Sequence, residues 1–141
     1  MTGIPANVTL TNYFGVYPIQ GQTGVPVCML VETPNAFADV TSANTASTTT
    51  SPISINSTLG SKLHISSFVV TEKASGAAVP MRPAVTAVQF PNDLLPNSAY
   101  YVGQTPFKVS TAYQANVIGD VDGVPLTYNW SFTTGTNTTC H

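Results

Sequence analysis

The most marked shortage in this sequence is of charge. Asp, Glu, Lys and Arg make up 7% of its 141 residues, against about 25% in an average soluble protein. The only cations besides two histidines are Lys62, Lys73, Arg82 and Lys108, and they are scattered. Binding to a nucleic-acid backbone or to an anionic membrane surface needs a cluster of cations. The composition therefore argues against both kinds of partner.

Long apolar runs are lacking as well. No run reaches the roughly 18 apolar residues of a transmembrane helix, so we expect no membrane insertion. Residues 1–14 lack the basic region and apolar stretch of a signal peptide. Thr, Ser and Asn take the place of the missing charges, which fits a secreted, periplasmic or cell-surface module better than a cytosolic enzyme. We therefore expect this chain to be a fragment of a longer exported protein.

Cysteine is scarce, with Cys28 and Cys140 alone. They form no CxxC motif, and His141 beside Cys140 belongs to the tail, so we expect no metal site and no cofactor. One interpretation is a disulfide between the two, which would persist in an oxidising compartment. The other is one buried thiol and one exposed thiol.

A helical period is missing too, since no window of 11 residues repeats its apolar positions every 3.6 residues. Eleven prolines and ten glycines instead divide the chain into short alternating runs. This pattern predicts a single all-β domain over residues 1–141, an immunoglobulin-like antiparallel β-sandwich of seven to nine strands. The expected extended segments are 8–10, 14–18, 25–32, 52–56, 63–72, 79–83, 85–90, 99–104, 110–119 and 124–133.

Local signals refine two of these segments and predict two turns. The apolar parity slips within 63–72, which predicts a β-bulge at Ser66–Ser67. Segments 73–78 and 120–123 are expected to form turns. In the last strand one parity is apolar and should face the core; its members are Val124, Leu126, Tyr128, Trp130 and Phe132.

Residues 33–51 form the longest irregular stretch, rich in Thr and Ser. Because loops on a rigid sandwich carry recognition, and unpaired strand edges can accept another strand, we expect this stretch and the edge strands to provide contact surfaces.

Catalytic patterns are weak. Asp120 and Asp122 flank a turn, and no downstream Glu completes a calcium loop, so an Asp-Gly hairpin is the better interpretation. His64 is the one internal imidazole, and there is no GxSxG motif. An enzyme would require a pocket in which His64 meets a carboxylate and a hydroxyl. We predict that the protein is not an enzyme.

Aromatic side chains offer one binding alternative. Tyr101, Phe107 and Tyr113 lie within a short span and could form a stacking platform for a carbohydrate. Such a platform needs exposed rings beside hydrogen-bonding groups. These three are therefore the candidate ligand-binding residues.

Several segments, taken in order, resemble bacterial Ig-like domains. They are YPIQGQTGVPV (17–27), ETPN (32–35), FVVTEKASGAAVPMR (68–82), LLPNSAY (94–100) and the closing TPFKVSTAYQANVIGDVDGVPLTYNWSFTTG (105–135). The similarity is to the Ig-like module that follows a CAP domain in exported bacterial proteins, where CAP names the cysteine-rich secretory, antigen 5 and pathogenesis-related group. Cys28, Cys140 and the insert at 41–51 depart from that pattern.

The resemblance implies an upstream CAP-like domain and no catalytic residues on this module. It gives the expected function: a non-catalytic accessory module that docks, spaces or binds a protein partner at the cell envelope. The alternative is a module that binds carbohydrate or peptidoglycan through exposed aromatic rings.

Overall fold

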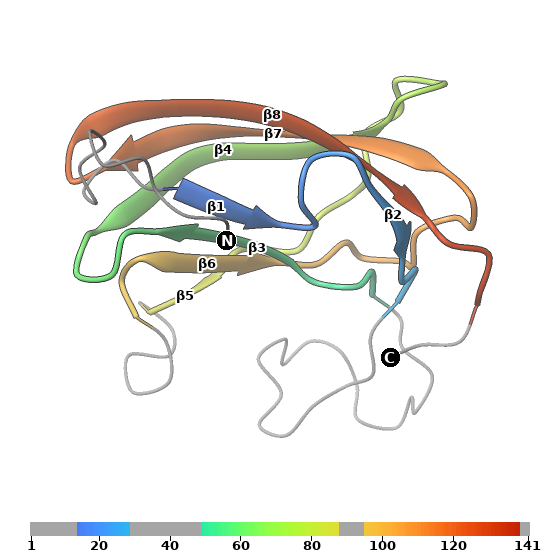
Figure 1. Ribbon diagram of the computed structural model, residues 1–141, viewed down its shortest axis with the longest axis horizontal. Helices are drawn as coiled ribbons and strands as arrows, with labels where there is room; N and C mark the ends of the chain where they lie inside the picture. Colours follow the sequence, from blue (N-terminus) through green and yellow to red (C-terminus); the bar gives the residue numbers. More distant parts are fainter. Residues whose placement is uncertain (1–13, 29–48, 88–94, 139–141) are drawn as a thin grey trace.

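The computed structural model describes residues 14–28, 49–87 and 95–138. These residues form eight β-strands and no helix, and so contain no helical membrane span. The strands are β1 (Phe14–Tyr17), β2 (Gln22–Val25), β3 (Ile53–Ser57), β4 (Leu63–Glu72), β5 (Val85–Thr86), β6 (Ser98–Tyr101), β7 (Ala112–Val121) and β8 (Val124–Thr134). Figure 1 shows them in two layers.

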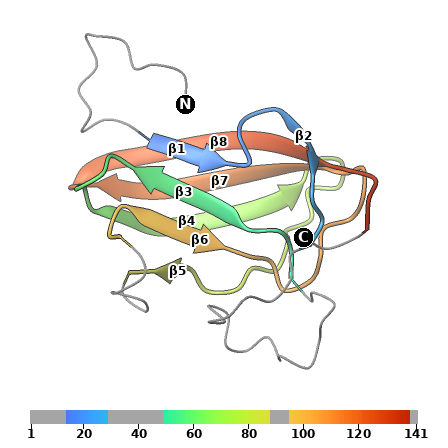
Figure 2. The same cartoon turned by 60° about the horizontal axis from the view of Figure 1, so that its bottom comes forward.

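Each layer is a four-stranded sheet. The first has the order β1-β3-β6-β5, which can be followed across the front of Figure 2. The second has the order β2-β8-β7-β4. All neighbours are antiparallel except β2 and β8, which are parallel. The predicted antiparallel arrangement therefore holds at every described pair except this one.

This strand order is that of an immunoglobulin-like sandwich. With β1, β3, β6 and β5 as strands A, B, E and D, and β8, β7 and β4 as G, F and C, both sheets match the constant-type arrangement. The short β2 then continues strand A across to the second sheet. The predicted all-β sandwich is confirmed, and its eight strands fall within the predicted seven to nine.

The core lies between the two sheets, because alternate residues of each strand point inward. The fully buried side chains from the first sheet include Ile53 and Ile55, and those from the second include Val70, Trp130 and Phe132. Apolar burial of this kind is the main favourable contribution to folding.

Two predicted local features are confirmed. The register of β4 against β7 shifts between Ile65 and Ser67, which is the expected bulge. β7 and β8 form a hairpin whose two turn residues, Asp122 and Gly123, have φ angles of 50° and 82°. Two positive φ angles define the type I′ turn that suits the twist of a hairpin.

Three expected strands are corrected. Segment 25–32 does not begin a strand: β2 starts earlier, at Gln22, and ends at Val25 before Pro26, which has no N–H to donate. Segment 79–83 forms only an isolated bridge, between Met81 and Gly103, as the chain crosses between sheets. In 85–90 the described strand is the two-residue β5. Segment 8–10 and residues 29–32 and 88–90 lie outside the described residues.

The predicted inner face of β8 is largely confirmed, with one error. Trp130 and Phe132 are 2% and 1% exposed, and Leu126 and Tyr128 are half-buried. Val124, however, is 59% exposed. It directly follows the hairpin turn, opposite Val121, at the end of the strand.

The end of the long irregular stretch is part of the body of the sandwich. Thr50 is fully buried, and its Oγ1 accepts a hydrogen bond from the N–H of Gly103 at 2.8 Å. The Ser51 hydroxyl donates to the carbonyl oxygen of Pro26 at 2.5 Å. Thr49 is buried as well. Residues 49–51 are therefore no contact surface, and residues 33–48 lie outside the described part of the chain.

Candidate functional site

The three aromatic residues expected to bind a ligand are buried. Tyr101, Phe107 and Tyr113 are 7%, 5% and 2% exposed. The Tyr101 ring stacks on Phe68 with centroids 4.1 Å apart, and Phe107 lies 4.6 Å from Tyr113 and 5.5 Å from Phe132. The prediction of an exposed stacking platform is wrong for these residues, because their rings fill the space between the sheets.

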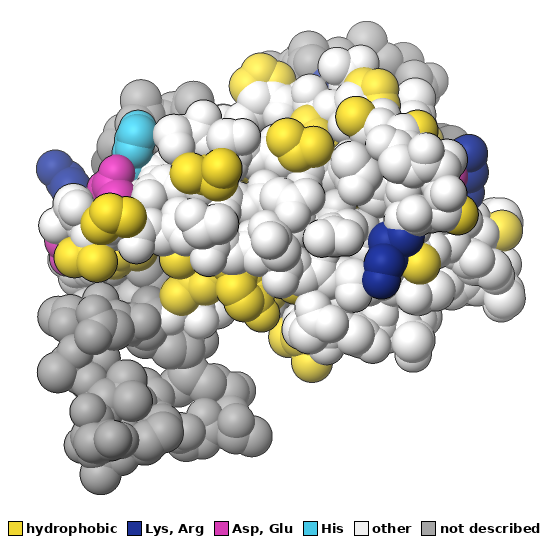
Figure 3. Space-filling view, turned by 90° about the horizontal axis from the view of Figure 1, so that it is seen from above, with side chains coloured by type: hydrophobic (Ala, Val, Ile, Leu, Met, Phe, Trp, Pro, Cys, Tyr) yellow, Lys and Arg dark blue, Asp and Glu magenta, His cyan; other side chains and the backbone are white. Residues whose placement is uncertain are grey.

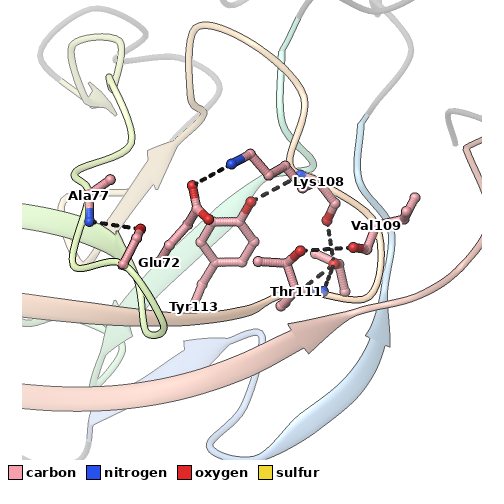
Figure 4. A network of polar contacts seen from close by, with 8 residues as sticks. Glu72, Ala77, Lys108, Val109, Thr111 and Tyr113 are labelled. Atoms are coloured by element: carbon pink, nitrogen blue, oxygen red, sulfur yellow. Dashed lines mark hydrogen bonds and ion pairs between the residues drawn. The ribbon is translucent and has the colours of Figure 1, made fainter.

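Tyr113 has a structural role that its position explains. Its hydroxyl oxygen accepts a hydrogen bond from the main-chain N–H of Lys108 at 2.9 Å. Beside it, the Lys108 ammonium lies 3.0 Å from the Glu72 carboxylate (Figure 4). Burial raises the pKa of the Tyr113 hydroxyl, and the hydrogen bond to Glu72 raises the pKa of Lys108. This network fastens the loop before β7 to the end of β4.

The two carboxylates of the 120–123 segment are held within the hairpin. Asp122 Oδ1 accepts from the N–H of Lys62 at 2.8 Å, and Asp120 Oδ1 accepts from the N–H of Gly123 at 3.2 Å. Both interactions fix the turn and the adjoining chain. The hairpin interpretation of this segment is confirmed.

His64 lies on β4 with its side chain 70% exposed, and its Nδ1 is 3.1 Å from Asp120 Oδ2 on β7. The imidazole therefore does meet a carboxylate, as an enzyme would require. An exposed pair of this kind lacks the shielding from water that strengthens electrostatic catalysis.

A hollow of about 180 Å³ opens between the sheets beside β4. Its lining includes His64 and the hydroxyl-bearing Thr86 and Ser98, together with apolar side chains such as Leu63 and Ile65. The Ser98 hydroxyl donates to Asn56 Oδ1 at 2.8 Å. Its proton is therefore directed to a neighbouring strand of the first sheet.

Cys28 is disulfide-bonded and 2% exposed. Its Sγ lies 3.8 Å from the carbonyl oxygen of Thr138, which brings the end of the described chain to Cys28. Cys140 lies outside the described residues, so its pairing with Cys28 stays a prediction.

One surface was missed by the sequence reasoning. On the outer side of the second sheet, the positions that alternate with the core residues of β4, β7 and β8 carry no charge over three successive rows. The sequence contains a signal for this surface. In 67–71, 114–118 and 127–131, the alternate positions that face outward hold only uncharged polar and aliphatic residues.

Comparison of the sequence with models of protein families and with curated proteins finds no match.

Proposed function

We propose that this chain is a non-catalytic accessory module of an exported bacterial protein, which docks, spaces or binds a partner at the cell envelope. The observation that carries the proposal is that its few carboxylates have structural contacts. Each carboxylate in the described ranges is engaged in holding a loop or turn: Glu72 with Lys108, Asp120 with His64 and Gly123, and Asp122 with Lys62.

The resemblance to Ig-like modules that follow a CAP domain supports the same proposal. The immunoglobulin-like strand order is what that resemblance implies, and such modules bring no catalytic residues. A CAP-like domain upstream and a secreted, periplasmic or cell-surface location are parts of this proposal.

The glycan-binding alternative in its original form has little support. Stacking on a sugar needs an exposed ring, and the three rings proposed for it are buried. The enzyme alternative has the His64–Asp120 contact in its favour. Against it stands the Ser98 hydroxyl, which lines the same hollow but is bonded to Asn56.

A replacement experiment tests the proposal. In the longer protein that we infer, this module is exchanged for an unrelated β-sandwich of similar length, or is deleted. Deletion should weaken retention of the protein in the cell-envelope fraction. If the unrelated sandwich restores retention, the module acts as a spacer. If only the native module restores it, the module docks or binds a partner.

Catalytic activity of the purified module would contradict the proposal. Hydrolysis of ester, glycoside or peptide substrates that disappears in both His64→Ala and Asp120→Asn would overturn the proposal. Gln104→Ala is the control for these substitutions, because Gln104 is exposed and lies in a loop outside β4 and β7.

A further inference from the structure

The outer surface of the second sheet carries nine side chains in three rows of three, which we call the polar grid. The register of β4, β7 and β8 defines the rows. They are Ser67–Ile118–Thr127, Val69–Asn116–Asn129 and Thr71–Gln114–Ser131. Neighbours lie roughly 4.8 Å apart across the strands and about 6.6 Å apart along each strand.

The polar grid is uncharged, and charged groups mark its ends. The row beyond Ser67 contains His64 and Asp120, while Lys73 follows the row of Thr71 and bonds through its N–H to Ala112. Figure 3 shows this face as a broad area of white and yellow, with the charged side chains toward its left and right. A polyanion or polycation would find no complementary charge on the grid.

The amides of the polar grid are free to bind a ligand. Within the described ranges, the side chains of Gln114, Asn116 and Asn129 make no hydrogen bond, whereas Ser131 is approached by the Gln20 side chain. A side-chain amide carries both a donor and an acceptor. The three therefore present paired donors and acceptors in two adjacent rows of a rigid sheet.

We propose that the polar grid binds an uncharged polysaccharide. The hydroxyl groups of a neutral sugar each donate and accept, so they can satisfy both ends of an amide and the hydroxyls of Ser67 and Thr127. The aliphatic side chains of Val69 and Ile118, 41% and 49% exposed, supply apolar contact for the C–H groups of the sugar rings.

A protein partner fits this surface less well. Interface hot spots are enriched in Trp, Tyr and Arg, and the polar grid has none of them. Each amide contact with a sugar contributes little alone because it replaces contacts with water. A polymer gains by engaging several rows at once. The inference rests on the proposed binding function and names its ligand class.

Native electrophoresis through gels that contain a polysaccharide tests the inference. The uncharged probes are starch, galactomannan and xyloglucan, and alginate is the charged probe. We expect retardation by at least one uncharged polysaccharide and none by alginate. The double variant Asn116→Asp/Asn129→Asp keeps the shape of both side chains, removes two donors, and should bind about tenfold more weakly.

The matched control is Gln104→Glu, which makes the same amide-to-acid change at an exposed position off the polar grid. It should bind the polysaccharide as the parent does, and thermal melts should show both variants folded. Amide chemical shifts recorded with an oligosaccharide of the retarding polymer should change on β4, β7 and β8 together.

Three results would overturn the inference: no retardation by any of the uncharged polymers, equal loss in Gln104→Glu, or shifts confined to other strands. Burial of the polar grid in a dimer, seen as a sedimenting species of twice the mass with these shifts, would assign the surface to a second copy instead. None of these outcomes alters the module-replacement result, so the accessory function can stand or fall independently.

Discussion

The hydroxyl oxygen of Tyr113, near the start of β7, accepts a hydrogen bond from the main-chain N–H of Lys108, five residues earlier in the chain, at 2.9 Å. In immunoglobulin-like sandwiches a tyrosine near the start of strand F makes such a bond, known as the tyrosine corner. It fastens the connection between the two sheets to the core. The residue expected to bind sugar is thus a structural device of the fold.

Replacing Tyr113 measures how much its hydrogen bond to Lys108 contributes to stability. Tyr113→Phe keeps the buried ring and leaves the Lys108 N–H without its acceptor, which should lower the free energy of unfolding by about 1–3 kcal/mol. Urea unfolding gives the value. Tyr100→Phe is the matched control, since Tyr100 is half-buried and no hydroxyl contact ties it to the described chain; it should change stability by less than about 0.5 kcal/mol. Equal midpoints for the two variants would contradict the assignment.

Trp130 should be among the largest single contributors to the core. It is 2% exposed and lies opposite Ala115 on β7. Trp130→Ala removes a large ring and leaves a cavity, so we expect a loss of about 3–5 kcal/mol by denaturant unfolding. Val124→Ala, on the same strand but 59% exposed, should cost little. If Trp130→Ala unfolds as the parent does, Trp130 does not lie in the core.

Phenylalanine at the same position separates size from polarity. The indole Nε1 of Trp130 is buried without a hydrogen-bond partner in the described structure. A buried, unpaired N–H opposes folding by roughly 1–3 kcal/mol. Trp130→Phe removes that N–H along with part of the ring, and its loss should fall clearly below that of Trp130→Ala. A loss as large as that of Trp130→Ala would contradict this expectation.

The sequence predicted the features that depend on neighbours along the chain. Alternation placed Trp130 and Phe132 inward, the slipped parity located the bulge near Ser66, and the Asp122–Gly123 pair marked a hairpin turn. In each case the local pattern and the tertiary contacts favour the same structure.

Features that depend on distant contacts could not be predicted in this way. Tyr101 was expected to bind a ligand because it lies close in sequence to Phe107 and Tyr113, and only its packing against Phe68 shows that the ring is buried. The contact of His64 with Asp120 joins strands that are far apart in sequence, through the register of β4 and β7. The polar grid needs the same register, which no single strand contains.

Stability should fall at alkaline pH because of Tyr101. Burial raises the pKa of its hydroxyl from 10.0 to about 12. The unfolded chain then loses this proton near pH 10 while the folded protein keeps it. The contribution is complete below about pH 10 and is lost as the pH rises toward about 12.

The measurement is urea unfolding at about pH 9 and about pH 11 for the parent and for Tyr101→Phe. The parent should lose more stability between the two values than the variant does. Tyr100→Phe should behave as the parent, since that residue is only half-buried. The same loss in the parent and in Tyr101→Phe would show that Tyr101 ionises alike in the folded and unfolded chains.

The disulfide of Cys28 is predicted to join Cys140. Protein made in an oxidising compartment should then have a mass two hydrogens lower before reduction than after it. Closing a loop of about 100 residues stabilises a protein by up to about 4.7 kcal/mol on the chain-entropy account. Cys140→Ser tests the cross-link alone, while Cys28→Ser also places a hydroxyl at a site that is 2% exposed. Cys28→Ser should therefore be the less stable of the two. Free alkylation of both thiols in the unreduced protein would disprove the pairing.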